Sequence, residues 1–261
     1  MLKKRICIVL CLLFGMALLT GADNRAINEA NAPQKCPILL YHHLTEQIPS
    51  DYETTTSVKK FDSDMKRILK AGYRPISLEE MYDYLLKGVS LPDKCVVITF
   101  DDGYESNYSL AYPILKKYGI KADIFINNDL VGASSVNGFP HFSWEQAREM
   151  EKSGLVTVYS HGYTHHDFTS VSLEQLREEY ERSQREIDRE LGPRKYNMVA
   201  YVGGEFNSLT FETLKNAGAD VQLLVSYQMD YSSIWSYSFF SRMTVYYTSD
   251  VVEMLDEYRA K

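Results

Sequence analysis

Two adjacent carboxylates, Asp101 and Asp102, follow a run of β-favouring residues over 96–100. Gly103 then ends the run, a pattern that indicates a buried strand presenting two acids at its carboxyl end. Neighbouring side chains on an extended backbone point to opposite sides, so one carboxylate can hold a metal ion while the other accepts a proton. Taken alone, Asp-Asp-Gly is equally typical of a turn that closes a strand, because Asp and Gly are ordinary turn residues.

Five of the six histidines fall into two clusters, and each cluster also follows a short apolar run: His42 with His43 after residues 37–41, and His161 with His165 and His166 after residues 155–160. The carboxyl ends of the strands of a parallel barrel converge on one face, where active sites are built. Two imidazoles and one carboxylate, with positions left for water and substrate, form a common catalytic zinc ligand set. The sequence therefore predicts metal-assisted hydrolysis.

Strand and helix patterns alternate along the chain, which predicts a parallel α/β fold. The predicted strands are 37–41, 96–100, 121–127, 155–160, 197–202, 221–226 and 241–246. The predicted helices include 58–71, a helix capped by Ser77 with Glu80, 106–118, 171–191, 209–217 and 251–258. Seven strands are one short of a complete eightfold barrel.

The first 22 residues have the features of a secretory signal peptide, with a basic start at Lys3-Lys4-Arg5, an apolar stretch over 6–19 and small residues at 20–22. The apolar stretch is shorter than the roughly 20 residues of a membrane span. An uncleaved N-terminal anchor is the alternative. We therefore expect a secreted or cell-surface protein with a signal peptide at 1–22, a flexible lead-in at 23–35 and one domain at 36–261.

The charge of the chain argues against nucleic acid as a partner. The net charge is −7, and removal of the leader, which carries three basic and no acidic residues, makes it −10. Nucleic-acid-binding proteins are usually basic. A neutral or cationic polymer is easier to accommodate, and no stable protein partner is implied.

Two cysteines remain after the leader. Cys36 stands six residues before His42, and Cys95 stands six residues before Asp101. If the two strands are neighbours in register, both thiols lie at the opposite rim and could come within bridging distance. The alternative is a pair of small buried residues.

Several stretches together resemble the polysaccharide deacetylases with a NodB-homology domain, carbohydrate esterase family 4, and in particular their exported poly-N-acetylglucosamine and peptidoglycan deacetylase-like branch. The matching stretches are PILLYHHL (37–44), TFDDGY (99–104), SHGYTHHD (160–167), KKFDSDMKRILKAGYRPISLEEM (59–81), ADIFI (122–126) and FSWEQAREMEKSGL (142–155). The resemblance covers residues 37–246 and implies a distorted (β/α)7 TIM-like barrel, the NodB-homology fold.

The resemblance also implies roles. Asp101 matches the general base and His42 the general acid, and the metal ligands match Asp102, His161 and His165, with His166 as the competing second imidazole. The implied cofactor is a divalent metal, Zn²⁺ first, with Co²⁺ or Ni²⁺ as alternatives. The implied reaction removes acetyl groups from an extracellular N-acetylglucosamine polymer and releases acetate. The alternatives are a glycan-binding pseudo-deacetylase with little turnover and an O-acetyl polysaccharide esterase.

Two motifs depart from the family pattern. Over residues 198–205 the arginine that orients the catalytic aspartate in many members is absent, and Val202-Gly203 replaces Pro-Tyr. Gly162 stands where Ser or Thr is usual. These departures predict a thinner support for catalysis around an intact metal site.

Five further residues receive weaker assignments. We expect Tyr201 and Gly203 to contact substrate, the latter through its backbone N–H. Trp235, in a Tyr/Ser-rich loop, is expected to stack on a sugar or, alternatively, to plug the core. Arg242 can supply a charge near the site. His141 is expected in a surface loop.

Overall fold

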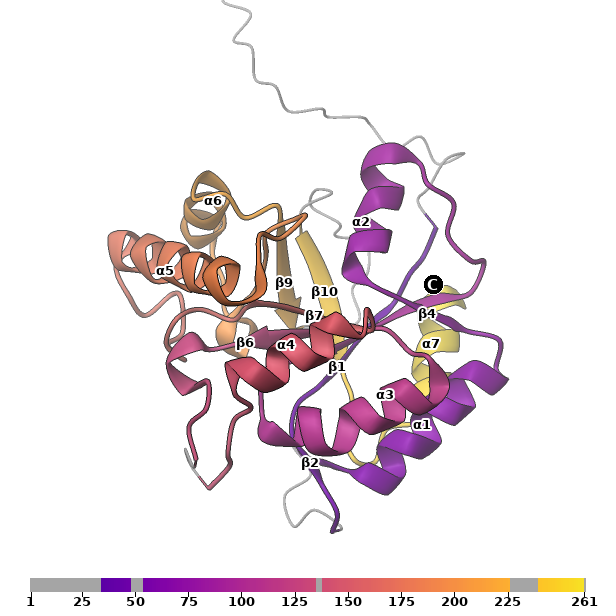
Figure 1. The fold of residues 1–261 in the computed structure, drawn as a ribbon. Coiled ribbons are helices and arrows are strands. Elements are labelled where there is room, and N and C mark those ends of the chain that lie inside the picture. The colour runs from indigo at the N-terminus through magenta and orange to yellow at the C-terminus, as the bar shows by residue number, and fades with distance from the viewer. Residues whose placement is uncertain (1–33, 48–53, 135–137, 226–238, 261) are drawn as a thin grey trace, which may run out of the picture. The chain divides into compact units, whose positions relative to one another are not determined.

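Strand β1 (Ile38–Tyr41) lies between β5 (Cys95–Phe100) and β10 (Phe239–Thr244), and these two pairings close the sheet into a barrel. The remaining strands of the barrel are β6 (Ala122–Ile126), β7 (Val156–Ser160), β8 (Met198–Ala200) and β9 (Val221–Val225). All pairings are parallel. The structure, a computed structural model, describes residues 34–47, 54–134, 138–225 and 239–260 (Figure 1). The closed seven-stranded barrel confirms the predicted fold class.

Three short strands lie outside the closed ring. Strand β4 (Arg74–Ile76) pairs with the beginning of β5. Strands β2 (Leu44–Thr45) and β3 (Thr56–Ser57) pair with each other and bring the segment after β1 next to the first helix. The sequence patterns did not predict these three strands, because two or three residues are too few to show an alternating pattern.

Helices cover the outside of the barrel: α1 (Val58–Lys70), α2 (Leu78–Lys87), α3 (Tyr112–Tyr118), α4 (Trp144–Lys152), α5 (Leu173–Leu191), α6 (Ser208–Asn216) and α7 (Val251–Ala260). The predicted capping box of α2 is present, since Ser77 and Glu80 accept each other's backbone N–H. The predicted helix 106–118 is present as one continuous helical segment, in which a π-helical turn, Asn107–Ala111, leads into α3. Pro113 has no N–H and its ring needs space, and the wider turn before it provides that space.

The helix α2 covers the end of the barrel at which the strands begin. Leu78, Met81 and Tyr82 of α2 pack in one cluster with side chains from the barrel interior. The backbone N–H of Leu78 donates to Asp123 Oδ2 over 2.9 Å, and Asp123 is completely buried on β6. This carboxyl group therefore ties the first turn of α2 to the barrel, at the end opposite to the carboxyl ends of the strands.

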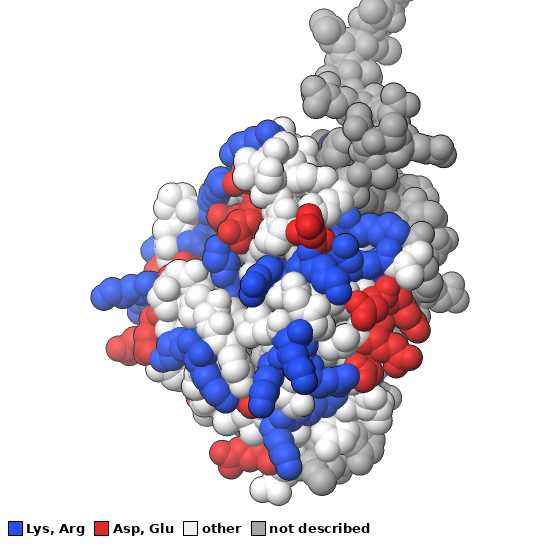
Figure 2. Space-filling model, turned by 90° about the vertical axis from the view of Figure 1, so that its right-hand side faces the viewer, with Lys and Arg blue, Asp and Glu red and all other residues white. Residues whose placement is uncertain are grey.

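The outer surface mixes charges of both signs. Figure 2 shows lysine and arginine side chains interspersed with acidic ones on the side of the molecule where α1 and α7 lie in Figure 1. Ion pairs join neighbouring elements there, as Lys117 with Asp62 at 2.7 Å shows. No helix within the described residues combines the length and apolarity needed to cross a bilayer.

The two cysteines at the start of β1 and β5 do not form a disulfide. Cys36 and Cys95 are both buried free thiols. Burial and the neighbouring Cys95 raise the pKa of the Cys36 thiol well above its ordinary value. The two cysteines lie near each other because β1 and β5 are paired, with Ile38 opposite Val97. The structure thus shows the alternative of two small buried residues.

We expect the stability of the protein to depend on pH through Asp123. Burial, with Glu79 and Glu80 nearby, raises the pKa of Asp123 from 3.8 to about 8. A raised folded-state pKa contributes stability that is complete near pH 4 and is lost as the pH rises through about 8. Asp123→Asn keeps an acceptor for Leu78 N–H, so it should be more stable than wild type at pH 8, by at most about 5 kcal/mol, and equal to it near pH 4.

Urea unfolding at both pH values measures the difference. Glu257→Gln, which changes an exposed carboxylate on α7, controls for general charge effects. A difference between Asp123→Asn and wild type that stays constant from pH 4 to pH 8 would contradict this assignment.

Candidate active site

A sharp turn at the end of β5 begins at the second of the two adjacent aspartates. Asp102 has a left-handed φ of 72°, and so does Gly103 at 73°. A Cβ on Gly103 would lie 2.8 Å from Ile126 Cγ2, so only glycine fits there. Asp tolerates the left-handed region better than most residues. The turn, rather than an extended strand, is what directs the two carboxylates to different partners.

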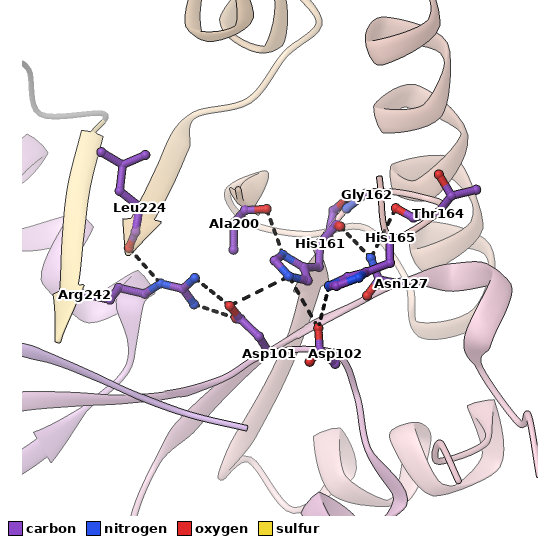
Figure 3. Close-up of polar contacts among 11 residues, drawn as sticks. Asp101, Asp102, Asn127, His161, Gly162, Thr164, His165, Ala200, Leu224 and Arg242 are labelled. Carbon is purple, nitrogen blue, oxygen red and sulfur yellow. Dashed lines mark hydrogen bonds and ion pairs between the residues drawn. The ribbon is translucent and has the colours of Figure 1, made fainter. Parts of the chain in front are cut away.

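Asp101 makes a bidentate ion pair with Arg242, inside the barrel. The Nη1–Oδ1 and Nη2–Oδ2 distances are 2.6 and 2.7 Å (Figure 3). Arg242 is wholly buried on β10, its Nε donates to the carbonyl of Leu224, and its guanidinium lies 5.2 Å from the ring centre of Phe125. Planar two-point pairing fixes the orientation of the carboxylate as well as its charge.

The pair keeps Asp101 ionised. Burial alone would raise the pKa of this carboxyl group, but Arg242 and, to a smaller extent, His161 hold the pKa below its ordinary value. A charge in such a position depends on its partner, because an unpaired buried carboxylate would be neutralised instead. Asp101 is therefore a fixed anion with its oxygens in a set direction.

Asp102 faces two imidazoles. Its Oδ1 lies 3.5 Å from His161 Nε2 and 3.2 Å from His165 Nε2. One ligand atom from each of these three residues lies within 4.8 Å of the others. Asp102 Oδ1 is buried, yet it has no hydrogen-bond partner among the described residues. An orphaned carboxylate oxygen between two imidazole nitrogens fits a shared divalent cation, whose preferred donors these are.

The protonation of His161 suits a metal ligand. Its Nδ1–H donates a hydrogen bond over 2.9 Å to the carbonyl of Ala200, which leaves Nε2 unprotonated and free to coordinate. Burial lowers the pKa of His161, although both aspartates act in the opposite direction. Asp102 raises the pKa of His165. The competing His166 lies outside the triad, with its Nδ1 3.0 Å from Thr164 Oγ1.

His42 is held by the segment that follows the two aspartates. Asn107, on the π-helical turn, donates to the carbonyl of His42 over 2.8 Å, and Ser106 Oγ accepts the N–H of Leu44 over 3.0 Å. His43 has a different environment: its ring packs 4.3 Å from Phe139, and burial lowers its pKa to about 4. π-Helical turns are frequent at functional sites.

One cleft brings most of the predicted residues together. It has a volume of about 560 Å³ and is lined by His42, Thr54, Asp101, Asp102, Tyr104, His161, His165, Gly203, Val225, Thr244 and Tyr246. Tyr201 is not among them: its side chain is completely buried and its hydroxyl donates to Gln222. The structure therefore does not support a substrate contact for Tyr201. Trp235 lies outside the described residues.

The comparisons with known proteins agree with this geometry. Residues 88–222 match the family model described as polysaccharide deacetylase. The chain belongs to the polysaccharide deacetylase family.

Two curated relatives and one solved structure illustrate the likeness. YxkH of Bacillus subtilis (strain 168), itself assigned to the polysaccharide deacetylases, is 32% identical over 196 residues, covering 75% of this chain and 66% of the relative. The poly-β-1,6-N-acetyl-D-glucosamine N-deacetylase of Staphylococcus aureus (strain MRSA252) is 28% identical over 172 residues, covering 63% of this chain and 59% of the relative. The chain thus spans about two thirds or less of these relatives.

The Streptococcus pyogenes deacetylase PplD, solved in complex with acetate, superposes with a TM-score of 0.76. The superposition covers 86% of this chain and 98% of that one, at 24% identity. At this level of identity the likeness concerns the fold, and it places this chain's barrel among those of solved deacetylases.

Asp101 has an arginine partner although residues 198–205 contain none. The partner is Arg242 on β10, which the sequence identified only as a charge near the site. Gly162 has a φ of 88°, and a Cβ there would lie 3.0 Å from both the ring of Phe168 and the carbonyl of Thr164. A side chain at this position would be strained by the left-handed backbone and would require Phe168 or the Thr164 carbonyl to shift.

The prediction of a surface position for His141 was wrong. His141 is 6% exposed and forms a bridge with Tyr104, which follows the two aspartates. The two rings are 5.1 Å apart. Both line a second pocket of about 280 Å³ on the other side of Asp102 and His165. The sequence around His141 gave no signal of its burial, because the backbone β-bridge to Tyr104 joins segments almost 40 residues apart.

We expect Arg242→Met to destabilise the protein by about 3–5 kcal/mol, because it leaves the Asp101 carboxylate buried without a partner. The double variant Asp101→Asn/Arg242→Met removes both charges and should recover most of the loss. Chemical denaturation of the two single variants and the double variant completes the cycle. Additive losses, with no recovery in the double variant, would show that the two side chains are not coupled.

Proposed function

We propose that the protein is a metal-dependent de-N-acetylase acting on an extracellular polymer that contains N-acetylglucosamine. The observation that carries the proposal is the single cleft that holds an oriented carboxylate, a histidine and an Asp-His-His ligand set. Family membership supports the same reaction class. Export by the N-terminal leader belongs to the proposal, since the described residues begin at Gln34.

The metal site has a defined share in this chemistry. Asp102, His161 and His165 would hold the divalent cation, with Zn²⁺ the first choice because one carboxylate and two imidazoles are typical zinc donors. When bound, such a cation polarises the acetyl carbonyl and makes a water molecule more acidic. The neutral Nε2 of His161, set by the carbonyl of Ala200, is in the state that coordination requires.

The other groups of the cleft move protons. Asp101 is ionised and held by Arg242, so it can accept a proton from the attacking water without first changing its rotamer. His42, on another strand end of the same cleft, would give a proton to the departing amine nitrogen. Gly203 lines the same cleft, and its backbone N–H would support the developing oxyanion.

The choice of polymer rests on the relatives and on charge. The relative from Staphylococcus aureus is named for poly-β-1,6-N-acetyl-D-glucosamine. The present chain has a net charge of −7, which favours a neutral polymer or its cationic deacetylated product over a polyanion. Poly-N-acetylglucosamine is therefore the first substrate to test, and peptidoglycan the second.

The pair of Asp101 with Arg242 favours an enzyme over a glycan-binding pseudo-deacetylase. Two charges with 2% and 0% exposure cost a large desolvation free energy, and a binding module gains nothing from an oriented anion beside the metal site. The geometry does not separate amides from esters, because both would use the same groups.

We expect the protein to release free amines from β-1,6-linked N-acetylglucosamine oligomers only when Zn²⁺ or Co²⁺ is restored after chelation. Asp101→Asn should lower kcat by about 10²- to 10⁴-fold, while Asp62→Asn on the surface of α1 should behave like wild type. Amine release by a fluorescent label measures the rate. Release of acetate from an O-acetylated xylan, but not from the amide oligomers, would favour the esterase instead.

We expect His42→Gln to lower kcat by about 10²- to 10⁴-fold on the same oligomers, with Zn²⁺ affinity unchanged, because His42 is not among the three ligand residues. An activated ester with a good leaving group needs no protonation, so the variant should lose much less activity on it. An equal loss on both substrates would contradict the role of His42 as general acid.

A further inference from the structure

The second metal-binding imidazole sits on an exposed loop. His161 directly follows β7 and is buried, whereas His165, four residues later, has 51% of its side chain exposed. To bring His165 Nε2 within 3.2 Å of Asp102, the backbone must reverse through Gly162, which has a left-handed φ of 88°. A loop with so little packing of its own needs an anchor to hold this shape.

Asn127, which directly follows β6, provides that anchor. Its Nδ2 group donates to the carbonyl of His161 over 2.7 Å and to the carbonyl of Thr164 over 3.3 Å (Figure 3). One amide group therefore bridges two carbonyls three residues apart, at the two ends of the reversal. Asn127 is 0% exposed, so water cannot replace these donors when the side chain is removed.

Two further hydrogen bonds support the backbone of the same loop. The backbone N–H of Asp129 donates to the carbonyl of Tyr163 over 3.1 Å. The N–H of Gly162 donates to Ser160 Oγ over 3.1 Å. Asn127 is distinct from these contacts because it alone, among the described residues, joins the carbonyl of a ligand residue to the carbonyl just before the second ligand.

We propose that Asn127 is a positioning residue for the metal site: it sets the distance between the two imidazole ligands by clamping the loop from His161 to Thr164. It does not touch the metal position itself. The inference deepens the proposed function, since it rests on the same Asp-His-His set, but it concerns metal binding and is tested without turnover. Supporting groups of this kind commonly change metal affinity by about 10- to 100-fold.

A second buried asparagine offers a matched control. Asn107 is also 0% exposed, and its Nδ2 donates over 2.8 Å to the carbonyl of His42, a histidine outside the ligand set. The oxygen of each asparagine has no hydrogen-bond partner among the described residues. Removal of either side chain therefore leaves similar defects in the core, but only Asn127 bears on the metal ligands.

The experiment compares Asn127→Ala, Asn107→Ala and Asn127→Leu, which keeps a similar volume and loses both donors. Zn²⁺ affinity is measured by competition with a chromophoric chelator, and Co²⁺ binding by its visible absorption spectrum. We expect Zn²⁺ affinity to fall about 10- to 100-fold in both Asn127 variants and to stay within about threefold of wild type in Asn107→Ala. The Co²⁺ spectrum of Asn127→Ala should shift toward that of His165→Ala.

Three results would overturn the inference. Unchanged affinity in the Asn127 variants would remove the positioning role, and an equal fall in Asn107→Ala would make the effect a general consequence of a damaged core. Failure of the wild type to bind Zn²⁺ would remove the inference together with the metal site. Should Asn127→Ala not fold, Asn127→Leu decides. If the expected pattern of affinities is observed but the protein does not deacetylate, the proposed function is contradicted and this inference stands.

Discussion

The ion pair between Asp101 and Arg242 is the contact on which the site depends. Each charge is almost completely removed from water, and the desolvation of two such ions is tolerated only with close pairing and further hydrogen bonds. Arg242 satisfies this through Asp101 and the carbonyl of Leu224. The partners come from β5 and β10, which flank β1 on either side. The pair can therefore form only when the barrel is closed. Closure of the barrel and orientation of the Asp101 carboxylate thus occur together.

The remaining groups of the site follow the same arrangement, in which each side chain is held from a different strand end. The carbonyl that sets the tautomer of His161 belongs to Ala200 on β8, and the amide that clamps the following loop belongs to Asn127 after β6. Asn107, beyond β5, holds the backbone of His42 after β1. Because these supports lie on neighbouring strands, small shifts in register would separate the carboxylates from the histidines. The seven parallel strands thus act as a common frame.

The sequence was sufficient for features that depend on local pattern and insufficient for those that depend on distant contacts. Strands ending in polar residues and the capping box at Ser77 could be predicted because each signal lies within a few residues. The role of Arg242 could not, since its partner is 141 residues away along the chain. The requirement for glycine at position 162 depends on Phe168 folding back over it. The π-helical turn within the predicted helix 106–118 had a local signal in Pro113, which the apolar pattern obscured.

The metal site couples local strain to binding. Asp102 occupies the left-handed region at some cost, of the order of 1–2 kcal/mol for most residues, and its buried Oδ1 lacks a hydrogen bond, which costs about 1–3 kcal/mol. A shared cation would relieve the second cost because it would become the missing partner of that oxygen. It would also join an exposed loop, through His165, to the end of β5. Metal binding should therefore stabilise the fold as well as complete the site, since the ligands are brought together only in the folded barrel.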